Sequence, residues 1–341
     1  MIVSTIVCSL SGFASANPLV AYSCRYYYPA RSPKTSVHQV YVSDVYGGHR
    51  RQITFDKSEK TQVQWVGKHK LAWIESEGLS ERETWYGYHM PTKRESDIPL
   101  PGKLVLYDLQ TNRRKLIARG NFRGGSLNFF DTTCPRGVAA YFQYLVSAKG
   151  DTYQDRNIKR FLITAKSIKT TGKVTQVEYG RPTNPWSVLK LDKEPQGSSK
   201  EFVYRDREGQ STGGDYITQN ITMHGKTVFV PVDVDEVWKS NDNWKAWFQI
   251  ATRAGSAGSD EWIYEIDWKK GTSKVVVNEV LGIDFDSHAR YWAAGSNNKS
   301  TTQLGKLMIW SGDLWCGDLR TGKQWRIAAG PVHGDCAAIQ P

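Results

Sequence analysis

Alternating apolar and polar positions run through most of the chain and predict β-strands rather than helices. Several stretches share one spacing: an aliphatic residue, Asp four positions later, Gly or Asn four after that, and an aliphatic residue five further on. Gly or Asn supplies the positive φ angle of a tight hairpin turn, and the Asp can accept hydrogen bonds from the backbone of the turn. Each copy is therefore expected to fold as strand, turn, strand, with a structural Asp. The aspartates are Asp44, Asp108, Asp267 and Asp318, with a looser copy around Asp192.

A second pattern precedes each hairpin: an aromatic residue, a short polar turn and another strand. It is clearest at 64–73 and 285–293, and looser versions occupy 130–141 and 221–230. Antiparallel strands that are joined by short turns pair with each other, so each such segment and the hairpin after it are expected to form one small sheet. The chain is therefore predicted to be nearly all β.

The two ends of the chain carry the two halves of one further copy. Residues 336–341 resemble the first half of the second pattern, cut in its turn, and residues 17–22 resemble the other half. A ring explains this split, because its last strand would close against its first and remove the exposed sheet edges. We expect the C-terminal strand to join the N-terminal sheet.

These motifs resemble the WD40-like (PD40) repeat of TolB-type β-propellers, and the likeness covers most of residues 17–341. It implies a single β-propeller domain. Five hairpins with five preceding segments favour five blades, while a hairpin-like piece at 161–179 leaves six possible, as in TolB-type rings. The expected blades are 335–341 with 17–55, then 61–119, 126–204, 216–278 and 282–330.

Long segments are expected between the second and third strand of every blade, on one face of the ring. Long loops on a rigid scaffold are where binding sites are built. Aromatic residues accompanied by Arg and Lys are typical of protein contacts, and they also suit sugar stacking. The alternative is that the aromatic side chains pack these loops onto the scaffold. The candidate ligand-binding residues are Tyr26, Tyr27, Tyr28, Trp85, Tyr86, Tyr88, His89, Trp238, Trp244 and Trp247.

The chain is basic, with a net charge of +11 over 341 residues. A positive balance suits anionic partners or serves solubility alone. The sequence has no run of five basic residues and no RNA-binding signature of the Lys/Arg-Gly-Phe/Tyr type, which argues against nucleic acid.

Residues 1–16 are apolar and end in Ala14-Ser15-Ala16, which predicts a signal peptide cleaved before Asn17. The alternative is a buried first strand. Sixteen residues are too few to span a bilayer comfortably, and no other segment approaches that length. We therefore expect a periplasmic or secreted protein without a transmembrane segment.

Cysteine usage offers no zinc motif, because no pair has C-x-x-C spacing. On the closing blade, Cys24 and Cys336 are expected within about two residues of facing each other, and a disulfide there would stabilise the closure by about 2–4 kcal/mol. Cys134 and Cys316 fall on different blades and are expected to be buried apolar residues.

Catalytic motifs are few. The sequence has no G-x-S-x-G, P-loop or dinucleotide fingerprint, and its histidines are scattered. Carboxylates that could serve a glycosidase are Asp131, Asp215, Asp284, Asp286, Glu178 and Glu208, but no spaced pair among them compels that interpretation.

We therefore favour a non-catalytic propeller that needs no cofactor or metal and binds an envelope or extracellular protein, or a polysaccharide. The alternative is a carbohydrate-active enzyme, a glycosidase or lyase, with carboxylates in the central funnel.

Overall fold

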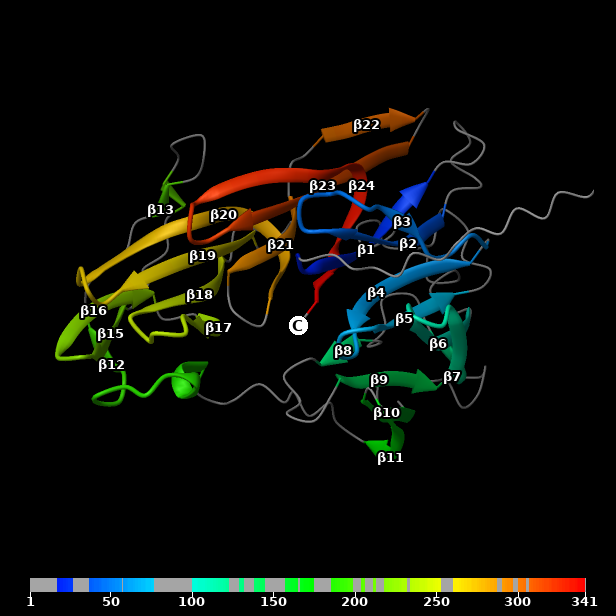
Figure 1. Cartoon of the computed structure of the whole chain (residues 1–341), viewed down its shortest axis with the longest axis horizontal. Helices are drawn as coiled ribbons and strands as arrows, with labels where there is room; N and C mark the ends of the chain where they lie inside the picture. The colour runs from blue at the N-terminus through cyan, green and yellow to red at the C-terminus, as the bar shows by residue number, and fades with distance from the viewer. Residues whose placement is uncertain are drawn as a thin grey trace, which may run out of the picture.

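The described residues form β-strands and one short 3-10 turn, η2 (Pro185–Val188), which confirms the all-β prediction for this part of the chain. Four-stranded antiparallel sheets recur along it, an arrangement consistent with a β-propeller (Figure 1). Among the described residues, no helix is long and apolar enough to cross a membrane. The computed structural model describes residues 17–26, 37–56, 58–76, 100–122, 129–131, 138–144, 157–164, 166–174, 185–198, 204–205, 211–212, 218–231, 234–252, 260–286, 290–296, 300–304 and 307–340.

The first unit combines both ends of the chain. The last part of β24 (Lys323–Ile339) pairs with β1 (Leu19–Tyr26), which pairs with β2 (Val37–Asp44) and then β3 (Arg51–Gln52). The backbone N–H of Gln340 also donates to the carbonyl of Leu19 at 2.7 Å. The C-terminal strand thus joins the N-terminal sheet, as the split repeat predicts.

The second and third units are separate four-stranded sheets in chain order. The second unit contains β4 (Glu59–Trp65), β5 (Lys70–Ser76), β6 (Leu100–Asp108) and β7 (Arg113–Phe122). The third unit contains β8 (Phe129–Asp131), β9 (Val138–Tyr144), β10 (Asn157–Ile163) and β11 (Ile168–Val174).

The fourth unit is smaller. It pairs β12 (Gln196–Ser198), β15 (Thr218–Met223) and β16 (Lys226–Pro231). A two-stranded hairpin lies between them in sequence, formed by β13 (Tyr204–Arg205) and β14 (Ser211–Thr212).

The fifth and sixth units share long strands. The fifth unit contains β17 (Val234–Lys239), β18 (Lys245–Thr252), β19 (Asp260–Asp267) and the first part of β20 (Thr272–Phe285). The rest of β20 pairs with β21 (Tyr291–Ser296), which pairs with β23 (Leu307–Asp318), and β23 pairs with the first part of β24. An additional strand, β22 (Ser300–Leu304), pairs with β23.

The expected five-blade partition needs correction at two places. The predicted blade 216–278 is divided, because β19 pairs with β18 and not with β16, so that 234–252 are strands and not a loop. The predicted blade 126–204 also fails, because β10 and β11 complete a four-stranded sheet with β8 and β9 and leave residues 185–204 outside it. In both cases a polar hairpin forms regular strands of a sheet.

The hydrophobic core lies between consecutive units. Five clusters fill the junctions of the first unit with the second, the sixth with the first, the second with the third, the fourth with the fifth, and the fifth with the sixth. The alternation in β1 explains this: Leu19 and Ala21 face the second unit, whereas Val20, Tyr22 and Cys24 face the sixth. Both faces of the first, second, fifth and sixth sheets are therefore apolar.

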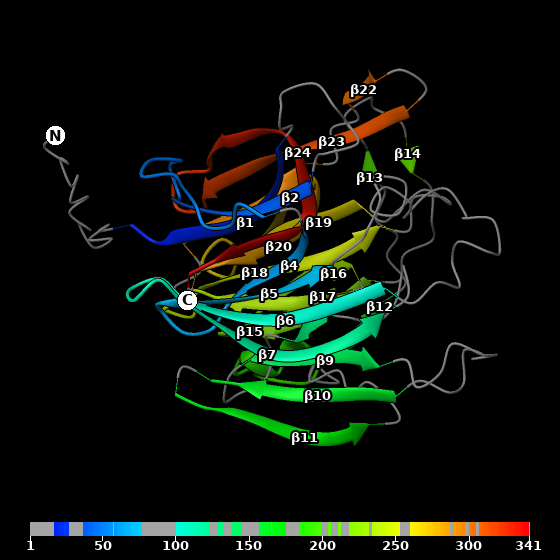
Figure 2. The same cartoon turned by 90° about the vertical axis from the view of Figure 1, so that its right-hand side faces the viewer.

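The short turns of the units lie on one face, called here the turn face. Inter-unit contacts join them: the indole N–H of Trp325 donates to the carbonyl of Val45 at 2.7 Å, and the Gln340 amide donates to the carbonyl of Lys68 at 2.6 Å. Turns β6–β7 and β10–β11 lie together on the left-hand side of Figure 2. The turn face contains the turns at 45–50, 66–69, 109–112, 164–167, 224–225, 240–244, 268–271 and 319–322.

Candidate functional site

Most of the predicted aromatic site lies outside the described residues. This holds for Tyr27, Tyr28, Trp85, Tyr86, Tyr88 and His89, and for the side chain of Tyr26, whose backbone ends β1. Their role in binding stays a prediction.

The structure corrects the placement of two predicted tryptophans. Trp247 on β18 is only 4% exposed and packs with Phe285 and Trp292 between the fifth and sixth units. Trp238 on β17 is half-buried, with its ring centroid 4.1 Å from that of Phe285. Because these residues occupy paired strands, their side chains enter the junction between sheets. Trp247 is a core residue and not a surface contact.

Trp244 lies on the turn between β17 and β18, and hence on the turn face rather than in a long loop. The ring of His224 stacks on it with centroids 4.0 Å apart, and Lys269 Nζ lies 5.7 Å from its centroid. The ring is only partly buried, so this aromatic and basic group remains accessible.

The proposed disulfide partners lie on neighbouring strands. Tyr22 is in register with Ala337 and Cys24 with Val332, with an irregularity between them, so Cys336 lies one residue from the position opposite Tyr22. The side chain of Cys336 is outside the described residues, and the disulfide stays a prediction. Burial raises the pKa of the Cys24 thiol to about 11.

The buried carboxylates of the described residues all serve the architecture. In four of them the carboxylate accepts backbone N–H groups of its own turn: Asp44, Asp267, Asp286 and Asp318. The other two, Glu75 and Glu265, form ion pairs with Arg114 and with Lys245 and Lys274. The structural role predicted for the turn aspartates Asp44, Asp267 and Asp318 is thus observed.

The carboxylates considered for catalysis divide in the same way. Asp284 accepts the backbone N–H of Ile339 at 2.8 Å and so helps to seat the C-terminal strand. Asp286 holds its own turn. Asp215, Glu178, Glu208 and the side chain of Asp131 lie outside the described residues. Among the described residues, no group of His, Cys, Asp or Glu is arranged to hold a metal ion.

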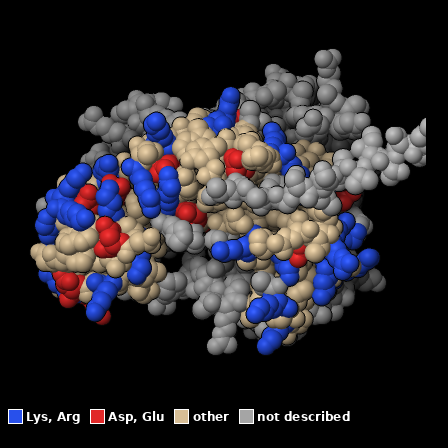
Figure 3. All heavy atoms as spheres, viewed as in Figure 1, with Lys and Arg blue, Asp and Glu red and all other residues tan. Residues whose placement is uncertain are grey.

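Basic side chains lie on the turn face of the first three units, a region called here the basic sector. Figure 3 shows this face, with Lys and Arg at the lower right over β4 to β11, and a further group of Lys and Arg on the left that is mixed with Asp and Glu. The acidic side chains in and beside the sector are Asp44 and Asp108, which accept backbone N–H groups of their own turns, and Asp56. The sector contains His49, Arg50, Arg51, Lys68, His69, Lys70, Arg113, Arg114, Lys115, Lys166 and Lys169.

A cleft of about 360 Å³ opens between the first and second units, beside the basic sector. Three of its lining residues are aromatic, and their side chains differ in exposure: Trp73 is buried, Tyr107 is 8% exposed and Phe55 is 77% exposed. The hydroxyl of Tyr107 donates to Asn112 at 3.0 Å, which fixes the ring. The remaining lining residues are Ile53, Thr54, Asp56 and Arg114.

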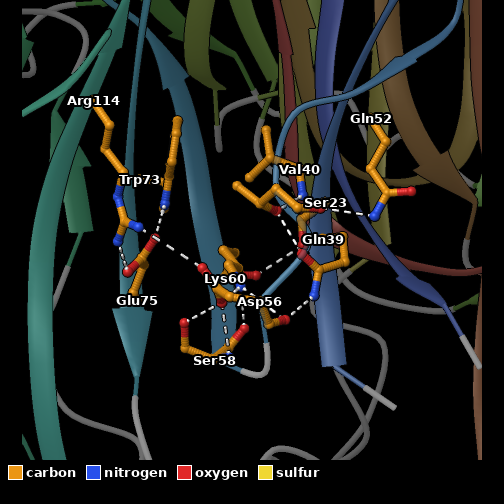
Figure 4. Close-up of polar contacts among 11 residues, drawn as sticks. Ser23, Gln39, Val40, Gln52, Asp56, Ser58, Lys60, Trp73, Glu75 and Arg114 are labelled. Carbon is orange, nitrogen blue, oxygen red and sulfur yellow. Dashed lines mark hydrogen bonds and ion pairs between the residues drawn. The ribbon is translucent and has the colours of Figure 1, made fainter. Parts of the chain in front are cut away.

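Two ion pairs meet at this cleft (Figure 4). The ammonium of Lys60 is fully buried and binds Asp56, while Arg114 binds Glu75, which also accepts the indole N–H of Trp73 at 2.9 Å. Arg114 Nη1 lies 3.8 Å from the Asp56 carboxylate and so links the two pairs. The network fixes segment 53–58 against the second unit and holds the Arg114 guanidinium at the mouth.

The protonation of Asp56 is set by this network. Burial alone would raise its pKa, but hydrogen bonds from Lys60 and Ser58 outweigh that effect and hold the pKa below its usual value. Asp56 is therefore ionised at neutral pH and remains a partner for both cations.

The sequence patterns did not predict this cleft. Its walls come from three separated stretches, 53–56, 73 and 107–114, which only the pairing of β2 with β3 and the packing of two sheets bring together. Spacing along the chain carries no signal for such a site.

Comparisons with known proteins give distant structural likenesses only. No protein-family model and no curated protein sequence matches the chain. TolB from Acinetobacter baumannii is similar with a TM-score of 0.45 and 13% identity, over 95% of this chain and 67% of that one. A putative 6-phosphogluconolactonase from Bacteroides fragilis gives 0.41 and 9%, over 96% and 99%. An oligogalacturonate lyase from Vibrio parahaemolyticus gives 0.30 and 10%, over 77% and 71%. At these values the likenesses assign no function to the chain.

Proposed function

We propose that this chain is a non-catalytic β-propeller that binds a macromolecular partner, an envelope or extracellular protein, through aromatic and basic side chains. The observation that carries the proposal is how the side chains are used. Every buried carboxylate of the described residues holds a turn or an ion pair, whereas Arg, Lys and aromatic groups remain accessible on the turn face. Such groups are the usual anchors of protein interfaces.

The scaffold belongs to the same proposal. Six sheet units would form a closed ring, with the pairing of β1 and β24 as the closure and the five apolar junctions as its core. A ring leaves no long sheet edge exposed, and it presents loops and turns on two rigid faces. Cleavage of the predicted signal peptide at 1–16 would place this ring in the periplasm or outside the cell.

The experiment is a pair of assays on the purified full chain. Immobilised protein is challenged with solubilised envelope proteins, and the free protein is applied to a glycan array that is read for both binding and turnover. Saturable retention of a protein partner, reproduced with that partner purified, supports the proposal. Turnover of a glycan would overturn it and favour a carbohydrate-active enzyme.

A further inference from the structure

The cleft between the first and second units has the features of an anchoring pocket. Its volume of about 360 Å³ falls within the range of small ligand sites, and its walls combine apolar and aromatic residues with Thr54, Asp56 and Arg114. Phe55 stands at its rim with 77% of its surface exposed. Covering a large apolar side chain of this kind is favourable, so an apolar group entering the cleft would gain contact with the exposed ring of Phe55.

The polar groups at the mouth are already oriented. Arg114 is held from two sides by Glu75 and Asp56, yet its side chain remains 45% exposed. A guanidinium has five N–H donors, so it can serve these carboxylates and still donate to an incoming acceptor. Because its position is fixed beforehand, little side-chain entropy is lost when a ligand binds.

The basic residues around the cleft favour a partner with negative charge. Arg51 donates to Tyr107 and Asn112 at the edge of the cleft, and Lys68, Arg113 and Lys166 lie further out in the basic sector. A surface of one sign steers an oppositely charged partner and raises its association rate. The flanks of the entering group are therefore expected to be acidic.

The shape of the cleft favours a protein segment over other anionic partners. Nucleic acids stack successive bases on several exposed aromatic faces, whereas at this cleft only Phe55 is exposed and Trp73 and Tyr107 are almost completely buried. A lipid surface needs apolar groups that project outward together, and at this cleft only Phe55 does so. A protein segment with one apolar side chain between acidic residues fits this cleft. The apolar side chain can cover Phe55, and the acidic residues can face the surrounding Arg and Lys.

We propose that this cleft is a docking site for an acidic protein segment that packs one large apolar side chain against Phe55, with Arg114 binding a carbonyl or carboxylate of the segment. The inference rests on the proposed binding function and names its site and the chemistry of its partner.

The test uses the full chain and a fluorescent peptide in which one Trp is flanked by Glu on both sides. Anisotropy is compared with that of a peptide whose Trp is replaced by Gly, and of one whose Glu residues are replaced by Lys. We expect only the first peptide to bind tightly. Raising the salt from about 0.1 M to about 1 M shortens the Debye length from about 10 to about 3 Å and should weaken this binding.

Two variants of the chain complete the experiment. Phe55→Ala removes an exposed ring without disturbing the core, and it should weaken peptide binding about tenfold. Val275→Ala in the fifth unit changes another exposed apolar residue and should leave the affinity unchanged. Equal binding of the Trp and Gly peptides, or equal affinity of Phe55→Ala and the unchanged chain, would overturn the docking site.

The two proposals can fail separately. If an envelope protein is retained and Phe55→Ala retains it equally well, the docking site is wrong and the binding function stands. If neither the peptide nor any envelope protein binds, both proposals fall. Displacement of the peptide by oligo(dT) but not by unlabelled peptide would assign the basic sector to nucleic acid instead.

Discussion

Val20 of β1 lies in register with Ile339 of β24, so residues from opposite ends of the chain form one antiparallel pair. Both are buried, with exposures of 0% and 2%, and both pack against the sixth unit. This pairing adds the last part of β24 to the N-terminal sheet, next to β1. The stability of this sheet therefore depends on a strand that comes from a distant part of the sequence.

Ile339→Ala should lower the free energy of unfolding by about 2–4 kcal/mol, because it leaves a cavity in the junction between the first and sixth units. Urea denaturation followed by far-UV circular dichroism measures this. The matched control is Leu116→Ala, whose side chain is 41% exposed and should cost less than about 0.5 kcal/mol. Equal midpoints for the two variants would mean that the last strand is not seated in the core.

The sequence predicted this pairing because the two ends of the chain carry the two complementary halves of one copy of the repeat. It also predicted three hairpin turns, where Asn112, Gly271 and Gly322 have the expected positive φ angles of 55°, 70° and 69°. In the first copy the positive φ angles fall on Gly47 and His49 and not on Gly48, where one was expected. These features are local and depend on few residues. A turn that needs a left-handed residue restricts the sequence at a fixed distance from its Asp.

The partition into units was not predictable in the same way. Segment 234–252 contains Trp, Asn and Asp around a turn, a composition typical of a surface loop, yet it forms the paired strands β17 and β18. Its tryptophans are strand residues that fill a junction, and alternation alone does not tell that role from a binding platform. The cleft was equally hidden, because tertiary packing creates it from separate segments.

The Asp56–Lys60 pair should make the free energy of unfolding depend on pH in the acid range. The folded pKa of Asp56 lies below its unfolded value of about 4, so the carboxylate stabilises the fold above that pH. This contribution is lost as the pH falls through the folded pKa. Asp56→Asn should cost about 1–3 kcal/mol at pH 7, less than for a fully buried pair, because Asp56 is 45% exposed. The difference from the unchanged chain should shrink below about pH 4.

A double-mutant cycle isolates the pair. Asp56→Asn leaves the fully buried ammonium of Lys60 without its carboxylate, and Lys60→Met removes that charge, so the double variant should recover part of the loss. Unfolding free energies measured from about pH 3, where carboxyl groups titrate, to about pH 7 give the coupling energy between Asp56 and Lys60. Strictly additive losses at all pH values would show that the pair does not act as a unit.

Asp286 should act as a structural residue. Its Oδ1 accepts the backbone N–H groups of Arg290 and Tyr291, both at 2.7 Å, and the residue is 6% exposed. Asp286→Ala leaves two donors without this acceptor and should cost about 2–3 kcal/mol, whereas Asp286→Asn keeps the oxygen and should cost about 1 kcal/mol or less. Thermal unfolding of both variants measures the difference. A stable Asp286→Ala protein that had lost a glycan-processing activity would support the enzymatic alternative.

Trp247 separates a core role from a binding role most directly. Trp247→Ala empties the junction between the fifth and sixth units and should cost about 3–5 kcal/mol. Trp247→Phe should cost much less, because the indole N–H has no hydrogen-bond partner among the described residues and its removal offsets part of the lost packing. Trp244→Ala, on the turn face, should change stability by less than about 1 kcal/mol.

The binding measurement completes this comparison. If Trp247 belongs to the core, the Trp247→Phe protein should bind any partner of the chain with unchanged affinity once its folded fraction is taken into account. A loss of affinity in a fully folded Trp247→Phe protein would restore Trp247 to the interface. In that case the β17–β18 hairpin would have to move on binding, because the ring is now covered by Phe285 and Trp292.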